Sequence, residues 1–241
     1  YEIASCLVGS EMCIRDSPVT RVAVVVFSSN SSLCGAFNAN VVKKLGETLE
    51  EYKSLGKENV LIYPVGKKVE QAVKKLGYTS QGSYQEMADK PSYVQAYELA
   101  ALLMQEFMEK QIDRVELIYH HFKSMGSQIL MREEYLPIDL SKVAATAATE
   151  GSGKRGFQND YIVEPSVGQL IADLLPKVLS QKLFTVLQDS NASEHAARTL
   201  AMQTATDNAN ELIQDLTKQY NKSRQQAITN ELLDIIAGSL K

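Results

Sequence analysis

The chain has 241 residues, of which 44% are hydrophobic and 22% are charged, and its net charge is −4. This composition is typical of a globular protein with one large or two small domains, and the acidic balance excludes a protein that binds nucleic acid through a basic face. No apolar run approaches the roughly 20 residues that span a bilayer, and three cysteines suit a reducing compartment, so we expect a cytoplasmic location.

Residues 1–17 have no hydrophobic period, no basic start and no initiating methionine. They do not form a convincing signal peptide, because Glu11 and Arg15 interrupt the apolar part. Two interpretations stay open, a loosely ordered N-terminus and a leader that is foreign to the natural protein.

The following segment predicts strands that alternate with helices. Residues 21–27 are a β-branched run typical of a strand covered on both faces, and a helix is expected over residues 36–53. A second strand is expected over residues 60–65, and a helix over residues 67–76 ends at Gly77. This alternation predicts an α/β domain with a mostly parallel sheet.

A further helix is expected over residues 92–110, with Pro91 at its start. Residues 114–122 and 128–135 alternate as strands do and could pair as an antiparallel hairpin at the edge of the sheet. Residues 143–159 are rich in Ala, Thr, Gly and Ser, which predicts a loop, and the domain boundary is expected near residues 161–167.

The sequence offers no convincing catalytic, cofactor or metal site. Residues 151–154 read GSGK but lack the spacing of a phosphate loop. His120 and His121 are neighbours on a predicted strand and therefore point to opposite faces, and His195 stands alone on a helix. Cys34 is expected to be a small buried side chain rather than a nucleophile.

The last third of the chain predicts one very long helix. Residues 177–237 contain neither proline nor glycine, and such a helix would be roughly 90 Å long, far longer than a domain of this size. Pro176 is expected to kink the helix or to delay its start. Apolar or small residues spaced by three and four form a seam typical of a coiled coil: Ala205, Ala209, Leu212, Leu216, Tyr220, Ser223, Ala227, Ile228, Leu232 and Ile235.

Two questions about this helix stay open from the residues alone. The same residues could form two or three core helices with a turn at residues 189–193. A coiled coil also needs a second strand, so either two copies of the chain pair or a partner helix lies upstream of this sequence.

Several motifs resemble the γ subunit family of F-type ATP synthases. Residues 193–198 read SEHAAR, residues 205–209 read ATDNA, and residues 220–232 read YNKSRQQAITNEL. Residues 33–38 (LCGAFN) and 161–165 (YIVEP) are similar to other parts of that family. The resemblance covers residues 19–240, whereas the family's N-terminal helix has no counterpart and residues 1–17 resemble nothing in it. We therefore hypothesise an N-terminally truncated chain with a foreign leader.

The resemblance implies a rotor in the centre of a rotary motor. Residues 18–165 would form a Rossmann-like foot domain, and residues 166–241 would form the long C-terminal helix, which in the family belongs to an antiparallel coiled coil. The foot would meet the ring of c subunits and the ε subunit, while the helix would turn inside a ring of α and β subunits. The family's γ subunit catalyses nothing and needs no cofactor. It reaches the cytoplasmic face of the bacterial plasma membrane only through other subunits.

The resemblance also implies contact residues. Arg224, Gln225 and Thr229 match positions that touch the β subunit, and Arg198 matches a further position that we expect to meet a β carboxylate. Tyr161 and Glu164 match positions that meet the c ring.

Two competing functions remain from the residues alone. One is a homodimeric α/β scaffold protein whose long helices pair with each other. The other is a small-molecule-binding enzyme that uses the end of the first strand, near residues 28–35, although that loop lacks a GxGxxG pattern.

Overall fold

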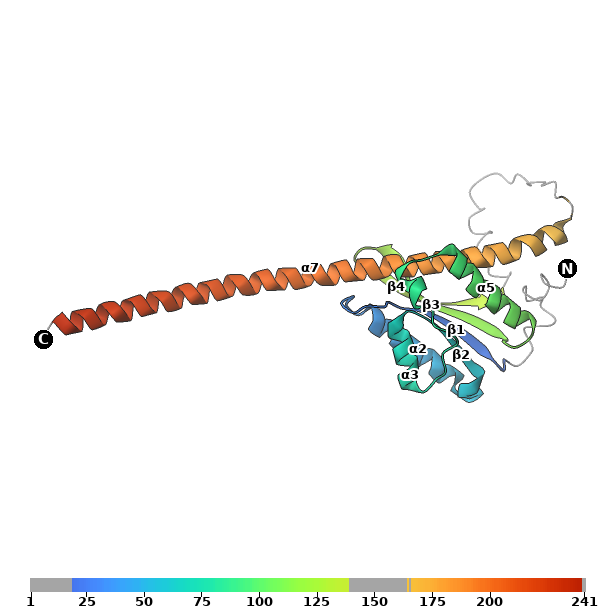
Figure 1. The fold of residues 1–241 in the computed structure, drawn as a ribbon, viewed down its shortest axis with the longest axis horizontal. Coiled ribbons are helices and arrows are strands. Elements are labelled where there is room, and N and C mark those ends of the chain that lie inside the picture. Colours follow the sequence, from blue (N-terminus) through green and yellow to red (C-terminus); the bar gives the residue numbers. More distant parts are fainter. Residues whose placement is uncertain (1–18, 139–163, 165, 240–241) are drawn as a thin grey trace, which may run out of the picture.

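The computed structural model describes residues 19–138, 164 and 166–239. The expectations for residues 1–17 and 143–159, and the predicted contact at Tyr161, therefore lie outside the described residues. Within them a compact α/β domain is followed by a single helix that extends far beyond it (Figure 1).

The sheet has four strands in the order β2-β1-β3-β4. Strands β1 (Val22–Phe27), β2 (Val60–Val65) and β3 (Arg114–Ser124) are parallel, with Val22 opposite Val60 and Arg114. Strand β4 (Ser127–Leu136) pairs antiparallel with β3 at the edge. The predicted mostly parallel sheet with a terminal hairpin is therefore confirmed.

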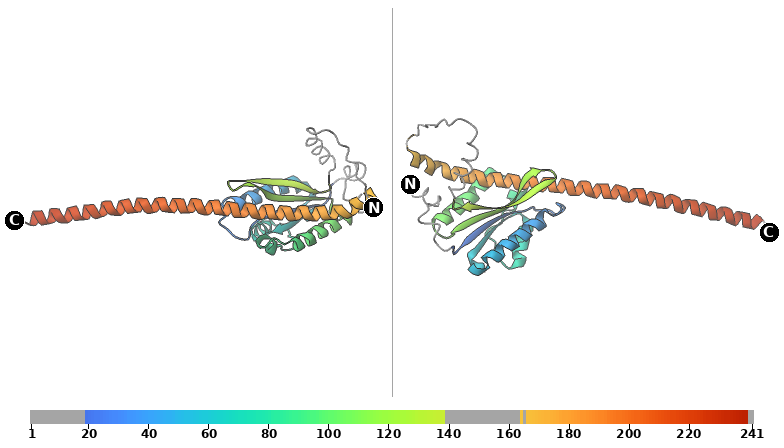
Figure 2. Two further views of the ribbon diagram at one scale, coloured as in Figure 1. Left: turned by 90° about the horizontal axis from the view of Figure 1, so that it is seen from above. Right: turned by 180° about the vertical axis from the view of Figure 1, so that it is seen from behind.

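Helices cover both faces of this sheet (Figure 2). On one face, α2 (Phe37–Glu51) and α3 (Lys67–Leu76) pack on alternate residues of β1, among them Val22, Val24 and Val26. On the other face, α5 (Tyr93–Met108) and the first part of the long helix pack on Ala23 and Val25. Burial on both faces explains why β1 is β-branched at nearly every position.

The structure adds detail that the sequence pattern did not provide. Two short 3₁₀ segments, Tyr52–Leu55 and Lys57–Asn59, follow α2, which ends earlier than expected. A short helix, α4 (Gln85–Asp89), was not predicted, because a helix of five residues is too short to show helical periodicity in the sequence.

The long helix α7 runs without interruption over Val167–Ser239. The alternative of several core helices with a turn at residues 189–193 is wrong, and so is the expected delay at Pro176, because that proline lies inside the helix. A proline inside a helix costs about 3 kcal/mol. The nearby burial of Leu179 and Leu183, at about 2 kcal/mol each, offsets that cost.

Candidate functional site: the long helix and its seat on the sheet domain

The first part of α7 shares the hydrophobic core of the sheet domain. Leu179, Leu183, Val186 and Leu187 are fully or almost fully buried and join the cluster formed by β1, β3 and α5. Their spacing of four, three and one places them on one side of the helix. We call the stretch of α7 from residue 179 to residue 198, with the residues that it contacts, the helix seat.

Polar side chains fasten the same stretch to three different parts of the domain. Lys182 donates to the carboxylate of Glu133 on β4 at 2.6 Å, and Asn191 donates to the carbonyl oxygen of Ala88 in α4 at 3.0 Å. The carboxylate of Asp189 lies 2.7 Å from Nδ1 of His121 on β3. The three side chains lie on different turns of α7, so their contacts resist both sliding and rotation of the helix on the sheet.

The most deeply buried polar link joins α7 to the centre of the sheet. Ser193 Oγ donates to the backbone carbonyl oxygen of His120 at 3.1 Å, and Ser193 is fully buried. The residues at 189–193 were a candidate turn in the sequence because they are polar. In the structure Ser190 and Ser193 lie on the buried side of the helix, whereas Ala192 is exposed. Ser190 follows Leu187 by three residues and Leu183 by seven, and this helical spacing is the signal that could have identified the buried side.

His120 is buried in the core whereas His121 is exposed, so the two neighbouring histidines point to opposite faces, as predicted. The His120 ring stacks on Phe37 with 4.3 Å between ring centroids. Nδ1 is buried and has no hydrogen-bonding partner among the described residues. Burial lowers the pKa of His120 to about 4, so the ring is neutral near pH 7.

Arg198 lies at the C-terminal end of the helix seat. Its Nη2 donates to Oγ of Ser31, in the loop after β1, at 2.6 Å and to the carboxylate of Glu194 at 2.7 Å. Glu194 is almost fully buried, and an opposite charge in direct contact compensates its loss of water. The structure therefore places Arg198 in an internal contact, and its expected contact with a β carboxylate stays a prediction.

Beyond the helix seat and the partly buried Ala201, α7 extends away from the sheet domain (Figure 1). Every residue from 202 to 238 is exposed, including Leu212, Leu216, Tyr220, Leu232 and Ile235 of the predicted seam. This exposed segment is about 55 Å long at the rise of an α-helix. A row of large apolar side chains on an isolated helix marks an interaction surface.

The predicted contact residues lie on this exposed segment or at the start of the helix. Arg224 and Gln225 are exposed, and Thr229 donates from Oγ1 to the carbonyl oxygen of Gln225 at 2.8 Å. Glu164 is exposed just before α7 begins. Because α7 is continuous, it separates Glu164 from Thr229 by more than 60 residues of helix, roughly 90 Å.

A hollow of about 420 Å³ lies where α7 leaves the domain. Its walls include Phe37 and His120 on one side and Ala197, Leu200 and Ala201 of the helix on the other. The hollow is continuous with the exposed seam, because Ala201 and Ala205 lie one helical turn apart.

The described residues contain no group of three or more His, Cys, Asp or Glu side chains placed to hold a metal ion. Across the same residues, no helix combines the length and the hydropathy of a membrane span. Cys34 is buried, and its Sγ accepts a hydrogen bond from Nδ2 of Asn38 at 3.0 Å, as expected for a structural cysteine.

Solved structures with the same fold come from ATP synthases. The Euglena gracilis mitochondrial ATP synthase, solved with OSCP, F1 and the c-ring, contains a chain with a TM-score of 0.59 and 23% identity, covering 91% of this chain and 72% of that one. A Tetrahymena thermophila mitochondrial ATP synthase central stalk and c-ring gives a TM-score of 0.58 at 20% identity, covering 81% of each chain. At these identities the likeness concerns the fold alone.

Sequence relatives are much closer. The family model described as ATP synthase matches residues 3–240, and thus begins upstream of residue 19, where the motif resemblance began. The ATP synthase gamma chain of Bacteroides fragilis is 69% identical over 233 residues, which cover 97% of this chain and 78% of the relative. That of Bacteroides thetaiotaomicron is 64% identical over 231 residues, covering 95% and 78%. The chain therefore belongs to the ATP synthase gamma chain family.

Proposed function

We propose that this chain is the central rotor subunit of an F-type ATP synthase, in which it passes rotation of the c ring to the catalytic β subunits. The observation that carries the proposal is the continuity of α7, which is anchored in the core of the sheet domain at one end and fully exposed at the other. Membership of the gamma chain family supports it.

The helix seat suits the transmission of torque. Torque applied to the sheet domain reaches α7 through a shared hydrophobic core and through polar links spread over residues 182–198, roughly 24 Å of helix. A close-packed interior has few voids and low compressibility, so the domain and the helix turn together.

The exposed segment suits a shaft that is completed by a partner helix. Its apolar seam and the hollow beside Ala201 would be covered by an antiparallel helix, as in the coiled coil that the family resemblance implies. Two paired helices resist bending better than one. In this arrangement Arg224, Gln225 and Thr229 contact the β subunits, while Tyr161 and Glu164 contact the c ring beside the ε subunit.

In this role the chain catalyses nothing itself, and the β subunits carry out the chemistry. It reaches the cytoplasmic face of the plasma membrane only through other subunits. A self-pairing scaffold, the competing interpretation, has no support from the relatives named above, which carry the gamma chain name.

The direct test is co-expression of the chain with the α and β subunits of the Bacteroides fragilis relative, with a bead attached to the sheet domain. We expect a stable complex in which ATP hydrolysis rotates the bead. The double variant Arg224→Ala/Gln225→Ala should lower the torque without changing the unfolding of the isolated chain, because both side chains are exposed there. Asn221→Ala, on the same exposed segment, is the matched control. A chain that sediments as a homodimer and does not bind α and β would disprove the proposal.

A further inference from the structure

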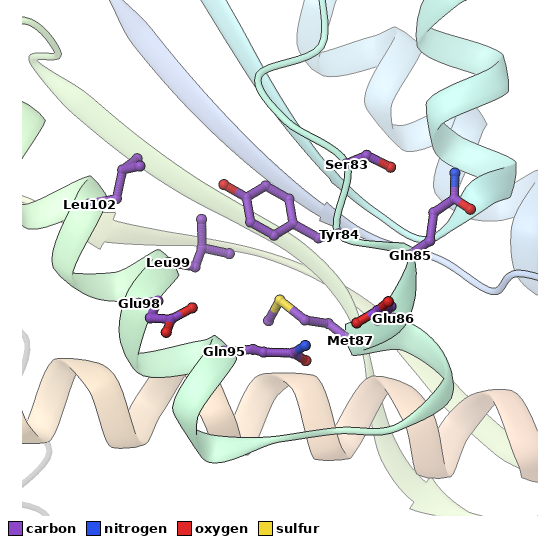
Figure 3. Close-up of a pocket in the computed structure, with 9 residues that line it drawn as sticks. All are labelled: Ser83, Tyr84, Gln85, Glu86, Met87, Gln95, Glu98, Leu99 and Leu102. Atoms are coloured by element: carbon purple, nitrogen blue, oxygen red, sulfur yellow. The ribbon is translucent and has the colours of Figure 1, made fainter.

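A second hollow lies between α5 and the segment of residues 83–87 (Figure 3). It is an open cleft of about 560 Å³. Tyr84, Met87 and Leu99 extend into its centre, and Glu86 and Glu98 lie at its α4 and α5 sides. No step in the proposed rotation uses this cleft.

The aromatic wall of the cleft is held in one position. Gly82 has a φ of +82°, and a Cβ atom there would lie 3.0 Å from the Tyr84 ring, so the ring packs directly against the glycine backbone. The centroid of the Tyr63 ring lies 6.5 Å from that of the Tyr84 ring. The Tyr63 hydroxyl donates to Glu106 at 2.6 Å, which fixes that ring in turn.

A buried carboxylate anchors the rest of this wall. Glu70 of α3 accepts hydrogen bonds from Ser83 at 3.1 Å and from Gln85 at 2.7 Å, and it pairs with Lys74 at 2.7 Å. The Lys74 hydrogen bond is the main cause that lowers the pKa of Glu70, so this carboxylate stays ionised and keeps its three partners. The wall therefore forms before any ligand arrives.

The charges that face the cleft are all negative. Glu86 and Glu98 line it, no lysine or arginine does, and neither carboxylate makes a side-chain hydrogen bond or ion pair within the described residues. A third carboxylate, Glu106, lies near Tyr84. Burial is the main cause that raises the pKa of Tyr84, and the negative charge of Glu106 raises it further. A tyrosine face flanked by carboxylates attracts a cation.

An apolar stripe continues from the cleft along the outer side of α5. Val94 and Leu102 are exposed by 62% and 39% and lie with Glu98 on one side of α5, at spacings of four residues, whereas Tyr93 packs edge-on against Phe184 of α7. A surface helix normally carries polar residues on its outer side. Since Leu102 belongs to both surfaces, the cleft and the stripe form one contact area for a protein rather than a pocket for a small molecule.

We propose that this cleft binds a lysine or arginine side chain presented by another subunit of the complex, a proposal that rests on the rotor function above. The aliphatic stem would lie on Met87, Leu99 and the Tyr84 ring, and the cationic end would face Glu86 and Glu98. Apolar residues beside that cation would cover the stripe on α5. Charge complementarity selects this partner, since an acidic or purely apolar segment would leave the two carboxylates uncompensated.

The first test places a photoreactive benzoyl-phenylalanine at Gln95, which lines the cleft, in the chain assembled with its complex. Irradiation should join it to a peptide of another subunit that contains a lysine or arginine within a few residues of the crosslink. The same probe at Lys43, on α2 at the opposite face of the sheet, should not crosslink to that peptide. An assembled, rotating complex with no crosslink at Gln95, or with a peptide that lacks a basic residue, overturns this proposal and leaves the rotor function standing.

The second test reverses charge. Glu98→Lys should weaken the affinity of the crosslinked subunit about tenfold, and exchange of the identified basic residue for glutamate should restore it. Glu58→Lys makes the same change in net charge at an exposed position away from the cleft and should have no effect. Equal affinities for Glu98→Lys and Glu58→Lys would refute the proposal. A wild-type chain that does not assemble at all would overturn both the cleft proposal and the rotor function.

Discussion

Arg198 on α7 donates a hydrogen bond to Ser31 in the loop after β1, across 2.6 Å in space and 167 positions in sequence. The same guanidinium neutralises Glu194 one turn earlier on the helix. One side chain therefore fastens the helix to the carboxyl end of the central strand and compensates a nearly buried charge.

We expect Arg198→Ala to destabilise the isolated chain by about 1–3 kcal/mol, because Glu194 is left as an unpaired, nearly buried carboxylate. Urea unfolding followed by circular dichroism would measure the change. The single variant Ser31→Ala and the double variant Arg198→Ala/Ser31→Ala complete a double-mutant cycle, which measures the coupling free energy between the two side chains. Unchanged unfolding of Arg198→Ala would contradict a stabilising role of its contacts with Ser31 and Glu194.

Leu183 tests the hydrophobic part of the helix seat. It is fully buried, so Leu183→Ala should cost about 2–5 kcal/mol of unfolding free energy through lost burial and the remaining cavity. Leu212→Ala, at a position on the same helix that is 60% exposed, should change the stability of the isolated chain by less than about 0.5 kcal/mol. If both variants unfold like the wild type, the first part of α7 is not part of the domain core.

His120 should make stability dependent on pH. Its pKa is about 4 in the folded chain and about 6.5 when unfolded, so below pH 6.5 the unfolded state binds more protons. The neutral, buried imidazole therefore contributes its full stabilisation of the folded chain above pH 6.5. This contribution, up to about 3 kcal/mol of unfolding free energy, is lost as the pH falls to about 4. The lowered pKa values of Glu70 and Asp113 act in the same direction, but only below the ordinary pKa values of carboxylates.

The measurement is the midpoint of urea unfolding between pH 7 and pH 5. His120→Phe keeps a ring next to Phe37 and removes the titrating group, so its stability should be nearly constant over this interval. A wild-type chain with the same flat profile as His120→Phe would show that the imidazole is not buried as described.

Gly66 connects β2 to α3 and allows no side chain. Its φ is +104°, and a Cβ atom would lie 2.3 Å from the backbone oxygen of Ser28. Ser28 follows β1 directly and is held there by a hydrogen bond from its backbone N–H to the carbonyl oxygen of Val65. Gly66→Ala should therefore cost more than about 3 kcal/mol and prevent most of the chain from folding.

Gly46 provides the matched control for that variant. It lies inside α2 with nothing within 4 Å of the added atom, so Gly46→Ala should raise stability by about 0.5–1 kcal/mol. Thermal unfolding of the two variants beside the wild type would measure both effects. Equal behaviour of the two variants would contradict the close approach of the β2–α3 turn to Ser28.

The sequence pattern was sufficient for the elements whose burial is regular. β1 is buried on both faces and is therefore apolar at every position, and the α3 helix ends at Gly77 as its composition predicted. The long helix was also evident, because a stretch without proline or glycine has no local signal that ends it. Motifs of the exposed segment were enough to indicate the family, which the sequence relatives then confirmed.

Other features depend on contacts between distant segments. Pro176 predicted a kink or a delayed helix start, but α7 begins before the proline, because burial of Leu179 and Leu183 stabilises the helix around it. The cluster at residues 189–193 resembled a turn, yet Ser193 and Asn191 find acceptors on His120 and Ala88, and these are close only in the folded chain.

What the sequence by itself determined was local: periodicity, helix length and the motifs of the family. Only the tertiary structure decided which polar residues of α7 are buried, that Arg198 pairs within its own chain, and that Tyr84, Glu86 and Glu98 face one cleft. The physical reason is that a polar side chain is stable in the interior only when a partner is within hydrogen-bonding distance. Such partners are set by packing between segments that lie far apart in the sequence.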